Sequence, residues 1–532
     1  MLSARDSQLG RFEQLLVDPS TVRATQRETL ARIATQLASG RLGREAGLAT
    51  VGPDSLVQHF RREVPLRDFE ALRAYIEPDP AQLAGEKPLC LLRTSASTGR
   101  PKLIPYTTGF RDGIKRAHDV FTQAIYRDSP ELPLTTGGMP RGLGLYQLST
   151  TEENALGLPV DSYVSRLYDV ALPDDPFFFA IDRSICRIPQ ATERLFAMAL
   201  TAARWDLRAL RATNPTTLLL FSRMLAESTE RFCRALSDGN DDATGVKVAP
   251  DPAHARRLSE LGRPLAARDL WPALDLLVTW RGGTCHLFEP HLRMAFGDVR
   301  IRAPIFAASE GVVAIPLSDA DLGGVPAIES SFFEFLPAPF DGTDTLLLHE
   351  LEQGATYELV LTSPTGMARY RIGDLVRVDG RYGGAAGAIP TFHFLSRKGR
   401  TSSVTGEKLT ELQVEEAVSS AARRVGAQPI HFLLSAQVDA LPYYVLSVDL
   451  GPGDGAVAVA LALAVDEQLA ALNIEYKAKR TSDRLGPIRA RRVRQGAFER
   501  LQAGGLSGGG AINFKLSHLS ADPVHERLEE LL

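Results

Sequence analysis

The hydrophobic pattern of this chain changes its period from one region to the next, and these changes constrain the fold most. In the N-terminal region, apolar residues recur at the spacing of amphipathic helices. After Pro250, short apolar segments alternate with helical patterns, which indicates an α/β protein. Residues 331–394 alternate with period two, as strands do, and the polar stretch 396–400 precedes a new αβ pattern. We therefore predict a large domain over 1–395, a hinge at 396–400 and a smaller α+β domain over 401–532.

Length and charge narrow the class of protein. A chain of 532 residues is too long for one ordinary core, so two or three folding units are expected. Its 60 basic and 64 acidic residues give a net charge of −4. This near-balance offers neither the basic footprint of a nucleic-acid-binding protein nor a polybasic membrane patch.

Cysteine usage and apolar run lengths bear on the compartment. The longest apolar run, residues 456–465, is about half the length of a membrane span. No hydrophobic signal core follows Met1. The cysteines stand far apart, with no C-x-x-C pair, and predict buried thiols in a reducing compartment: Cys90, Cys186, Cys233 and Cys285. We expect a cytoplasmic protein with no membrane partner.

A hydroxyl-rich loop follows an apolar stretch that predicts a buried strand. The stretch Leu89-Cys90-Leu91-Leu92 leads into the loop Thr94-Ser95-Ala96-Ser97-Thr98-Gly99-Arg100-Pro101-Lys102. Hydroxyls and backbone N–H groups can surround phosphate oxygens, and glycine permits close approach. The loop is not a Walker A motif, because no glycine lies five residues before Gly99. A polar connecting turn explains the same residues equally well, so the loop alone leaves phosphate binding open.

A second motif ends another predicted strand with a hydroxyl, a carboxylate and a glycine. It reads Phe306-Ala307-Ala308-Ser309-Glu310-Gly311. A carboxylate at this position could hold Mg²⁺, and the aromatic ring could border a flat base or a substrate. Taken by itself, a plain turn at a strand end is the simpler interpretation.

A third motif places an aspartate after a glycine turn between two predicted strands. It reads Arg369-Tyr370-Arg371-Ile372-Gly373-Asp374. An aspartate can accept hydrogen bonds from both hydroxyls of a ribose. The alternative is a turn aspartate that caps its own backbone.

Three other patterns resemble functional motifs but differ from them in spacing or in structural context. Residues 505–509 fit G-x-S-x-G, but a helical pattern precedes them and more glycine follows, unlike a strand-to-helix nucleophile elbow. His286 and His291 match neither H-x-x-E-H nor H-E-x-x-H, the spacings of zinc-binding helices, and Pro290 interrupts a helix there. The region 89–102 lacks G-x-G-x-x-G, so dinucleotide binding has no support.

The order of the motifs resembles that of the adenylate-forming superfamily: a phosphate loop, then Ser-Glu-Gly, then Tyr-Arg-x-Gly-Asp, then a hinge and a small domain. Within it, the chain is similar over almost its full length to the auxin-responsive acyl-acid amido synthetases, the Gretchen Hagen family. Further segments carry the resemblance: Leu103-Ile104-Pro105, Trp280-Arg281-Gly282-Gly283, Phe332-Phe333-Glu334-Phe335-Leu336-Pro337, Gly406-Glu407-Lys408-Leu409-Thr410-Glu411 and Asn513-Phe514-Lys515.

The resemblance implies a fold and a reaction. The fold is a large N-terminal adenylation domain, with β-sheets layered with helices plus a small β-barrel-like part, and a hinged C-terminal α+β domain. The enzyme would use ATP and Mg²⁺. A small carboxylic acid would attack the α-phosphorus, pyrophosphate would leave, and an amine such as an amino acid would take the acyl group from the acyl-adenylate.

The resemblance also implies residue roles. Glu310 would hold Mg²⁺, Asp374 the ribose, and Lys408 and Lys515 would bring positive charge as catalytic lysines from the C-terminal domain. The other ATP contacts would be Thr94, Ser95, Ser97, Thr98, Gly99, Lys102, Ser309 and Arg371. The acyl pocket, suited to a compact aromatic or short aliphatic acid, would contain Trp280, Gly282, Gly283, Phe306, Ala307 and Tyr146.

Departures from the family pattern leave alternatives open. Ala96 replaces a glycine of the plant loop, Phe306 replaces a usual tyrosine, and the superfamily's Ser-Gly-Lys tail is absent, so Lys515 is assigned by analogy. The acyl acceptor could instead be a thiol of CoA or of a carrier protein. A non-catalytic nucleotide-binding homologue is the second alternative.

Overall fold

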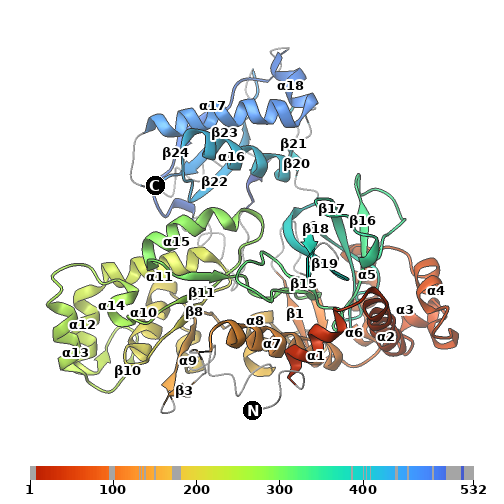
Figure 1. Cartoon of the computed structure of the whole chain (residues 1–532), viewed down its shortest axis with the longest axis horizontal. Coiled ribbons are helices and arrows are strands. Elements are labelled where there is room, and N and C mark those ends of the chain that lie inside the picture. Colours follow the sequence, from red (N-terminus) through yellow and green to blue (C-terminus); the bar gives the residue numbers. More distant parts are fainter. Residues whose placement is uncertain are drawn as a thin grey trace. The chain divides into compact units, whose positions relative to one another are not determined.

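The computed structural model forms two compact units, which are described separately (Figure 1). The first comprises Met1–Gly282 and Leu292–Phe394, and the second Gly283–His291 and Leu395–Leu532. The structure describes residues 7–94, 102–130, 132, 135–136, 139–148, 151–170, 181–384, 387–398, 401–402, 404–405, 407, 409–437, 441–451, 455–481, 485–498 and 517–520.

A parallel sheet in the first unit has the strand order β12-β11-β8-β5. Its strands are β5 (Gly142–Gly144), β8 (Ala209–Arg211), β11 (Leu276–Val278) and β12 (Arg300–Arg302). Buried parallel strands are near-continuous apolar runs, as in β11, and this matches the α/β pattern predicted after Pro250. The chain leaves β5 towards Tyr146 and β11 towards Trp280, at the carboxyl edge where open α/β sheets bind ligands.

Helices around this sheet share a core that contains Phe196, Phe221 and Trp271. The helix α11 starts at Pro215, after Asn214 has accepted a hydrogen bond from Thr216 N, as an N-cap does. The elements of this region are α9 (Arg183–Cys186), α10 (Ala191–Ala202), α11 (Pro215–Glu227), α12 (Thr229–Asp238), β9 (Asn240–Asp241), β10 (Val246–Lys247), α13 (Pro252–Ser259), α14 (Ala267–Leu270) and α15 (Glu289–Phe296).

A second sheet has the order β2-β1-β7-β6, and the predicted buried strand is its β1. Thr107 caps the long helix α7 by accepting a hydrogen bond from Phe110 N. The elements are β1 (Cys90–Arg93), β2 (Leu103–Tyr106), α7 (Thr108–Asp128), β3 (Thr135–Thr136), β4 (Met139–Pro140), β6 (Glu152–Glu153), β7 (Pro159–Asp161) and α8 (Tyr163–Val170).

The predicted strands between residues 331 and 394 form an antiparallel meander of linear order β16-β17-β18-β19. Its strands are β16 (Phe332–Pro337), β17 (Thr356–Thr362), β18 (Tyr370–Arg381) and β19 (Pro390–Arg397), with η3 (Leu348–Glu350) between the first two. A three-stranded sheet precedes it, made of β13 (Phe306–Ala308), β14 (Gly311–Ile315) and β15 (Val325–Pro326).

N-terminal helices pack in the same core as these two sheets. The Gln26 amide on α2 donates to the carbonyls of Ile328 and Ser331, at 2.8 Å each, and accepts from Phe333 N at 3.0 Å. The helices are α1 (Gln8–Leu15), α2 (Pro19–Leu37), α3 (Arg41–Glu45), η1 (Leu48–Thr50), α4 (Leu56–Glu63), α5 (Phe69–Ile76) and α6 (Pro80–Ala84). The helical pattern predicted at the N-terminus is confirmed.

The second unit contains a four-stranded sheet of order β24-β23-β22-β25 and a core shared with two long helices. Thr410 and Gln413 form a capping box that starts α16. The elements are β20 (Thr401–Ser402), β21 (Leu409–Thr410), α16 (Glu411–Val425), β22 (His431–Gln437), β23 (Tyr443–Asp449), α17 (Gly455–Leu472), α18 (Ile474–Thr481), β24 (Arg489–Arg492) and β25 (Leu519–Ser520).

Residues 283–291, which the sequence placed in the first domain, belong to the second unit. They comprise the 3-10 helix η2 (Gly283–Phe288) and the start of α15. The Phe288 ring meets the His431 ring edge-on at 5.0 Å, so this distant segment packs against the start of β22. Alternation in a sequence does not reveal such a long-range partner.

The helix α17 is, within the described part of the chain, the one helix long and apolar enough to cross a membrane by length and composition. Its mean hydropathy is 1.6 over 18 residues. Leu461, Val465 and Leu469 are buried in the core of the second unit. A core helix of a soluble domain would show the same composition, so α17 is weak evidence for a membrane span.

Candidate active site

The loop predicted to bind phosphate connects the strands of a β-hairpin. Strands β1 and β2 pair as far as Arg93 and Leu103, and Thr94 N donates to the Lys102 carbonyl at 3.0 Å. Both ends of the loop are therefore held together. The other predicted loop contacts lie outside the described residues, and their roles stay predictions: Ser95, Ser97, Thr98 and Gly99.

The Lys102 ammonium lies between two aromatic side chains. Its Nζ donates to the Tyr370 hydroxyl at 3.0 Å and lies 5.8 Å from the centre of that ring. The Phe69 ring, at the start of α5, is 5.4 Å from the same nitrogen. Both distances fall in the range of cation–π attraction. The Phe69 and Tyr370 rings thus stabilise the ammonium of Lys102, which was predicted to bind phosphate.

Glu310 occupies the two-residue turn between β13 and β14, with Ser309 beside it. Its carbonyl accepts hydrogen bonds from the hydroxyls of Ser363, at 2.5 Å, and Thr365, at 3.3 Å. The next residue must be small, because a Cβ on Gly311 would come within 2.5 Å of Leu361 Cδ2. These contacts fix the backbone of the turn from which the Glu310 side chain extends.

The Glu310 carboxylate is buried without a cationic neighbour. The residue is 3% exposed, and its Oε1 accepts a long hydrogen bond of 3.5 Å from the Tyr370 hydroxyl. No lysine, arginine or histidine nitrogen among the described residues lies within 4.0 Å of it. A buried carboxylate normally has a charged partner or binds a cation, so Glu310 fits the role of a Mg²⁺ ligand.

A single carboxylate does not make an all-protein metal site. The described residues contain no group of three or more His, Cys, Asp or Glu side chains able to hold a metal ion. Mg²⁺ is commonly bound through one or two carboxylates together with substrate phosphates and water. The arrangement therefore suits a metal that arrives with a nucleotide.

Backbone contacts from the N-terminal region fix the position of Tyr370. Arg67 N donates to the Arg369 carbonyl at 3.1 Å, and Arg371 N donates to the Arg67 carbonyl at 2.8 Å. Arg369 itself has φ 46°, a left-handed conformation that costs free energy in a non-glycine residue. A bidentate ion pair with the buried Glu334, at 2.9 and 3.0 Å, holds Arg369 in that conformation. Nothing in the sequence pattern predicts these contacts of Arg67 and Arg369, which we call the Arg369 clamp.

Asp374 lies within one continuous strand, β18, and not in a turn between two strands as the sequence predicted. The pairing of β17 with β18 shifts register between Glu358 and Val360, and Gly373, with φ 80°, lies in the bulge opposite them. Asp374 lies in the same bulge and is 2% exposed. A glycine–aspartate pair is compatible with a turn or a bulge, and the pairing partner decides between them.

Arg371, predicted as an ATP contact, is occupied by protein groups. Its Nε and Nη2 donate to the two Glu358 carboxylate oxygens at 2.9 and 2.7 Å, and Nη2 also donates to the Phe340 carbonyl at 2.8 Å. The hydrogen bonds to Glu358 raise the pKa of the Arg371 guanidinium. Its predicted role at the nucleotide stays a prediction.

Three aromatic rings form a cluster at the carboxyl end of β11. The Trp280 ring meets Phe306 edge-on at 5.3 Å and Phe394 at 5.9 Å, and the last two rings are 6.0 Å apart. Gly282 lies against them: a Cβ there would come within 3.0 Å of the Phe394 carbonyl oxygen. Ala307 packs against the same core. The sequence missed Phe394, which in an alternating strand looks like any core residue.

The remaining predicted pocket residues lie elsewhere. Tyr146 follows β5 and is buried in the core of the helical layer, two strands from β11 and so about 10 Å across the sheet. Gly283 belongs to the second unit. The structure thus brings together Trp280, Gly282 and Phe306, whereas Tyr146 packs in the core of the helical layer.

The two predicted catalytic lysines, Lys408 and Lys515, lie outside the described residues. The neighbour of the first, Glu407, is buried in the second unit and accepts hydrogen bonds from the Tyr444 hydroxyl and from the amides of Val404 and Thr405. Burial tends to raise the pKa of Glu407, but these hydrogen bonds outweigh it and lower the pKa. These hydrogen bonds tie the charged Glu407 to Val404, Thr405 and Tyr444.

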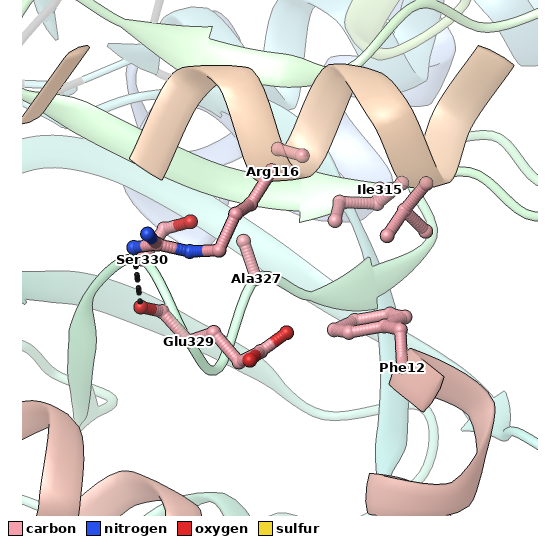
Figure 2. A pocket seen from close by; sticks show the side chains of 8 residues that line it. Phe12, Arg116, Ile315, Ala327, Glu329 and Ser330 are labelled. Atoms are coloured by element: carbon pink, nitrogen blue, oxygen red, sulfur yellow. Dashed lines mark hydrogen bonds between the residues drawn. The ribbon is translucent and has the colours of Figure 1, made fainter. Parts of the chain in front are cut away.

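A small pocket lies elsewhere in the first unit, lined by both apolar and charged side chains (Figure 2). It contains none of the predicted site residues. The only polar contact drawn there runs from the Arg116 guanidinium to the Glu329 carbonyl, at 3.5 Å. The lining residues are Phe12, Arg116, Ala117, Val120, Ile315, Ala327, Glu329 and Ser330.

Comparison with known proteins covers nearly the whole chain. Residues 8–301 match the GH3 family N-terminal domain, 324–397 the central domain and 412–524 the C-terminal domain. The probable indole-3-acetic acid-amido synthetase GH3.1 of Oryza sativa subsp. japonica is 28% identical over 92% of this chain and 85% of its own. The indole-3-acetic acid-amido synthetase GH3.8 of Oryza sativa subsp. indica is 29% identical over 89% and 85%.

Solved structures agree at the level of the fold. A GH3.15 acyl acid amido synthetase superposes with a TM-score of 0.83 at 22% identity, over 98% of this chain and 95% of its own. A 2-hydroxyisobutyryl-CoA ligase in the postadenylation state gives 0.59 at 13% identity, over 100% and 97%. The predicted α/β fold and the predicted enzyme class, an adenylate-forming ligase that joins an acid to an amine, are confirmed. The chain belongs to the GH3 family.

Proposed function

We propose that this enzyme uses ATP and Mg²⁺ to activate a small carboxylic acid and then transfers the acyl group to the amino group of an amino acid. The curated relatives are named amido synthetases for indole-3-acetic acid. The observation that carries the proposal is the buried Glu310, which has no cationic partner among the described residues. The Tyr370 hydroxyl lies between its carboxylate and the Lys102 ammonium and contacts both.

The residues would act by binding and orientation. Lys102 offers an ammonium to phosphate oxygens, and Asp374 offers a carboxylate to ribose hydroxyls. Bound at Glu310 together with the phosphates, Mg²⁺ would neutralise charge as pyrophosphate leaves. No covalent protein nucleophile is needed, because the difficulty is to bring two anions together in the correct orientation. Lys408 and Lys515 are proposed to add positive charge from the second unit.

The aromatic cluster supports an acid with a compact aromatic body. Trp280, Phe306 and Phe394 present ring edges and faces to one another, and aromatic substrates pack well in that geometry. A side chain at residue 282 would crowd the Phe394 carbonyl oxygen, so this position favours glycine. A short aliphatic acid is the second candidate substrate.

The test is a pyrophosphate-release screen over a panel of aromatic and aliphatic acids, followed by product masses in the presence of mixed amino acids and CoA. Acid-dependent pyrophosphate release and an amide product would support the proposal. A thioester product would instead identify a CoA or carrier-protein ligase. No exchange of labelled pyrophosphate with any acid would identify a non-catalytic homologue.

We also propose a reducing compartment, the cytoplasm, as the site of action. All four cysteines are free, and Cys90 and Cys186 are buried. Burial raises the pKa of the Cys186 thiol to about 12, which keeps it protonated and unreactive. Fractionation of the producing cells, with the enzyme found in the membrane or secreted fraction, would contradict this assignment.

A further inference from the structure

The hydroxyl of Tyr370 stands between two opposite charges that do not touch. Lys102 Nζ donates to it at 3.0 Å, and it donates to Glu310 Oε1 at 3.5 Å. The ammonium and the carboxylate are more than 4.0 Å apart, since they form no ion pair. Tyr370 is fully buried, so bulk water does not separate the two groups at this point.

Opposite charges at a buried site attract strongly, and a lysine side chain is long and flexible enough to follow that attraction. A direct pair between Lys102 and Glu310 would satisfy both groups, and each would then be lost to the nucleotide. A neutral phenol can accept from the ammonium and donate to the carboxylate at once. It therefore stabilises both charges while it keeps them apart.

We propose that Tyr370 is a positioning residue that prevents Lys102 and Glu310 from pairing, and so keeps the cation free for phosphate and the carboxylate free for a divalent metal. This inference rests on the proposed function and names a further residue for it. The Arg369 clamp supports it: the backbone on both sides of Tyr370 is bonded to Arg67, and Arg369 is held by Glu334. The hydroxyl therefore has little freedom to move away.

A role in core packing alone predicts different behaviour. The Tyr370 ring contributes to the core, and phenylalanine would keep that ring and remove only the hydroxyl. If the ring alone mattered, Tyr370→Phe would leave both metal binding and rate unchanged. If the hydroxyl separates the charges, the same substitution lets Lys102 move onto Glu310.

The experiment compares Tyr370→Phe with Tyr357→Phe as the matched control. Tyr357 lies on the adjacent strand β17, is also buried, and its hydroxyl accepts a hydrogen bond from Glu352 N at 3.1 Å, away from both charges. Mn²⁺ serves as the metal probe and is titrated by electron paramagnetic resonance with a non-hydrolysable ATP analogue. We expect Tyr370→Phe to weaken Mn²⁺ binding at least fivefold and the control to leave it within twofold.

A double-mutant cycle tests the cause. Lys102→Gln removes the ammonium, so Tyr370→Phe should have no further effect on Mn²⁺ binding in that background. An equal loss with and without Lys102 would overturn the inference, because the hydroxyl would then act without separating charges. Unchanged binding in Tyr370→Phe itself would overturn it as well. Thermal unfolding of each variant verifies that the fold is retained.

Steady-state rates separate this inference from the proposed function. Pyrophosphate release by Tyr370→Phe should fall about tenfold at low Mg²⁺ and recover as Mg²⁺ is raised, because the metal competes with Lys102 for Glu310. Wild-type release with an unaffected Tyr370→Phe variant would reject the role of Tyr370 and leave the proposed function standing. If wild type releases no pyrophosphate yet binds Mn²⁺ as predicted, the proposed reaction fails and the charge separation remains.

Discussion

Individual charged side chains at the proposed site are buried to an unusual degree. Glu310 is 3% exposed and Asp374 is 2% exposed, although carboxylates are seldom buried unless they have a partner or a function. Asp374 lies with Gly373 in the bulge of β18, so the bulged backbone sets the direction of its side chain. These two carboxylates are the residues whose chemistry can be tested most directly.

Asp374→Asn keeps the size of the side chain and removes the charge. If Asp374 holds the ribose, acid-dependent pyrophosphate release should fall more than tenfold, which corresponds to about 1.4 kcal/mol of barrier. Asp379→Asn is the control, since it makes the same change on the same strand at an exposed position paired with His393. Equal rates in wild type and a folded Asp374→Asn enzyme would remove Asp374 from the mechanism.

At the scale of an element, the bulge in β18 is the feature that aims a side chain. Gly373 has φ 80°, and no atom lies within 4 Å of the position where a Cβ would be. A substitution there meets conformational strain and no steric clash. Gly354, before β17, has the same φ of 80° and equally open surroundings.

Gly373→Ala and Gly354→Ala form a matched pair because strain is the same in both. We expect each to lose about 1 kcal/mol of unfolding free energy, the cost of a left-handed alanine. Only Gly373→Ala should also slow pyrophosphate release, because it redirects Asp374. Chemical denaturation and the rate assay measure the two effects, and a rate loss of similar size in Gly354→Ala would contradict the role of the bulge.

Elements were predictable from the sequence where one face or both faces are apolar. The meander over residues 331–394 was predicted from its period-two alternation. The strand before Thr94 was predicted from its continuous apolar run. The bulge did not, because Gly373-Asp374 is equally suited to a turn. The partners of Lys102 and Trp280 also did not, because Tyr370 lies 268 residues after the first, and Phe394 looks like an ordinary core residue.

At the scale of the whole molecule, a buried ion pair joins the N-terminal region to the meander. The Arg369 guanidinium binds both Glu334 oxygens and also donates to the carbonyls of Arg61 and Val64, at 2.6 and 2.9 Å. The side chains are 5% and 1% exposed. Removal of one partner from such a pair leaves the other charge buried and uncompensated.

Glu334→Gln should therefore destabilise the first unit by about 3 kcal/mol. Glu45→Gln is the comparison, since Glu45 pairs with Arg41 at 56% and 45% side-chain exposure and an exposed pair contributes about 0.5 kcal/mol. Thermal or chemical denaturation measures both changes. A loss below 1 kcal/mol in Glu334→Gln would show that the pair does not hold the region together.

The second unit should lose stability in acid. Burial, together with the nearby His518 and His291, lowers the pKa of His431 from 6.5 to about 3. A histidine that is neutral only in the folded state contributes stability above pH 6.5, and that contribution falls as the pH drops towards 3. Asp449 faces it across the ladder, and burial raises the pKa of that carboxyl, which acts in the opposite sense.

His431→Phe isolates the contribution of this histidine to the pH dependence. It removes the titrating imidazole and keeps an aromatic ring between Phe288 and Phe498. The unfolding free energy of the variant should depend less steeply on pH between 6.5 and 4 than that of wild type. His286→Gln, at an exposed histidine, should leave the pH profile unchanged. Parallel profiles for wild type and His431→Phe would contradict the assignment.

The membership of residues 283–291 in the second unit has a practical consequence for protein engineering. A recombinant fragment that starts at Leu395 would lack Phe288 and His291, and the ring of His431 would keep Phe498 but lose Phe288 as an aromatic neighbour. Such a fragment should expose the apolar surface that Phe288 covers, and it should therefore aggregate. Chimeras that exchange C-terminal units between relatives must therefore carry this short upstream segment along, inserted as a loop into the recipient chain.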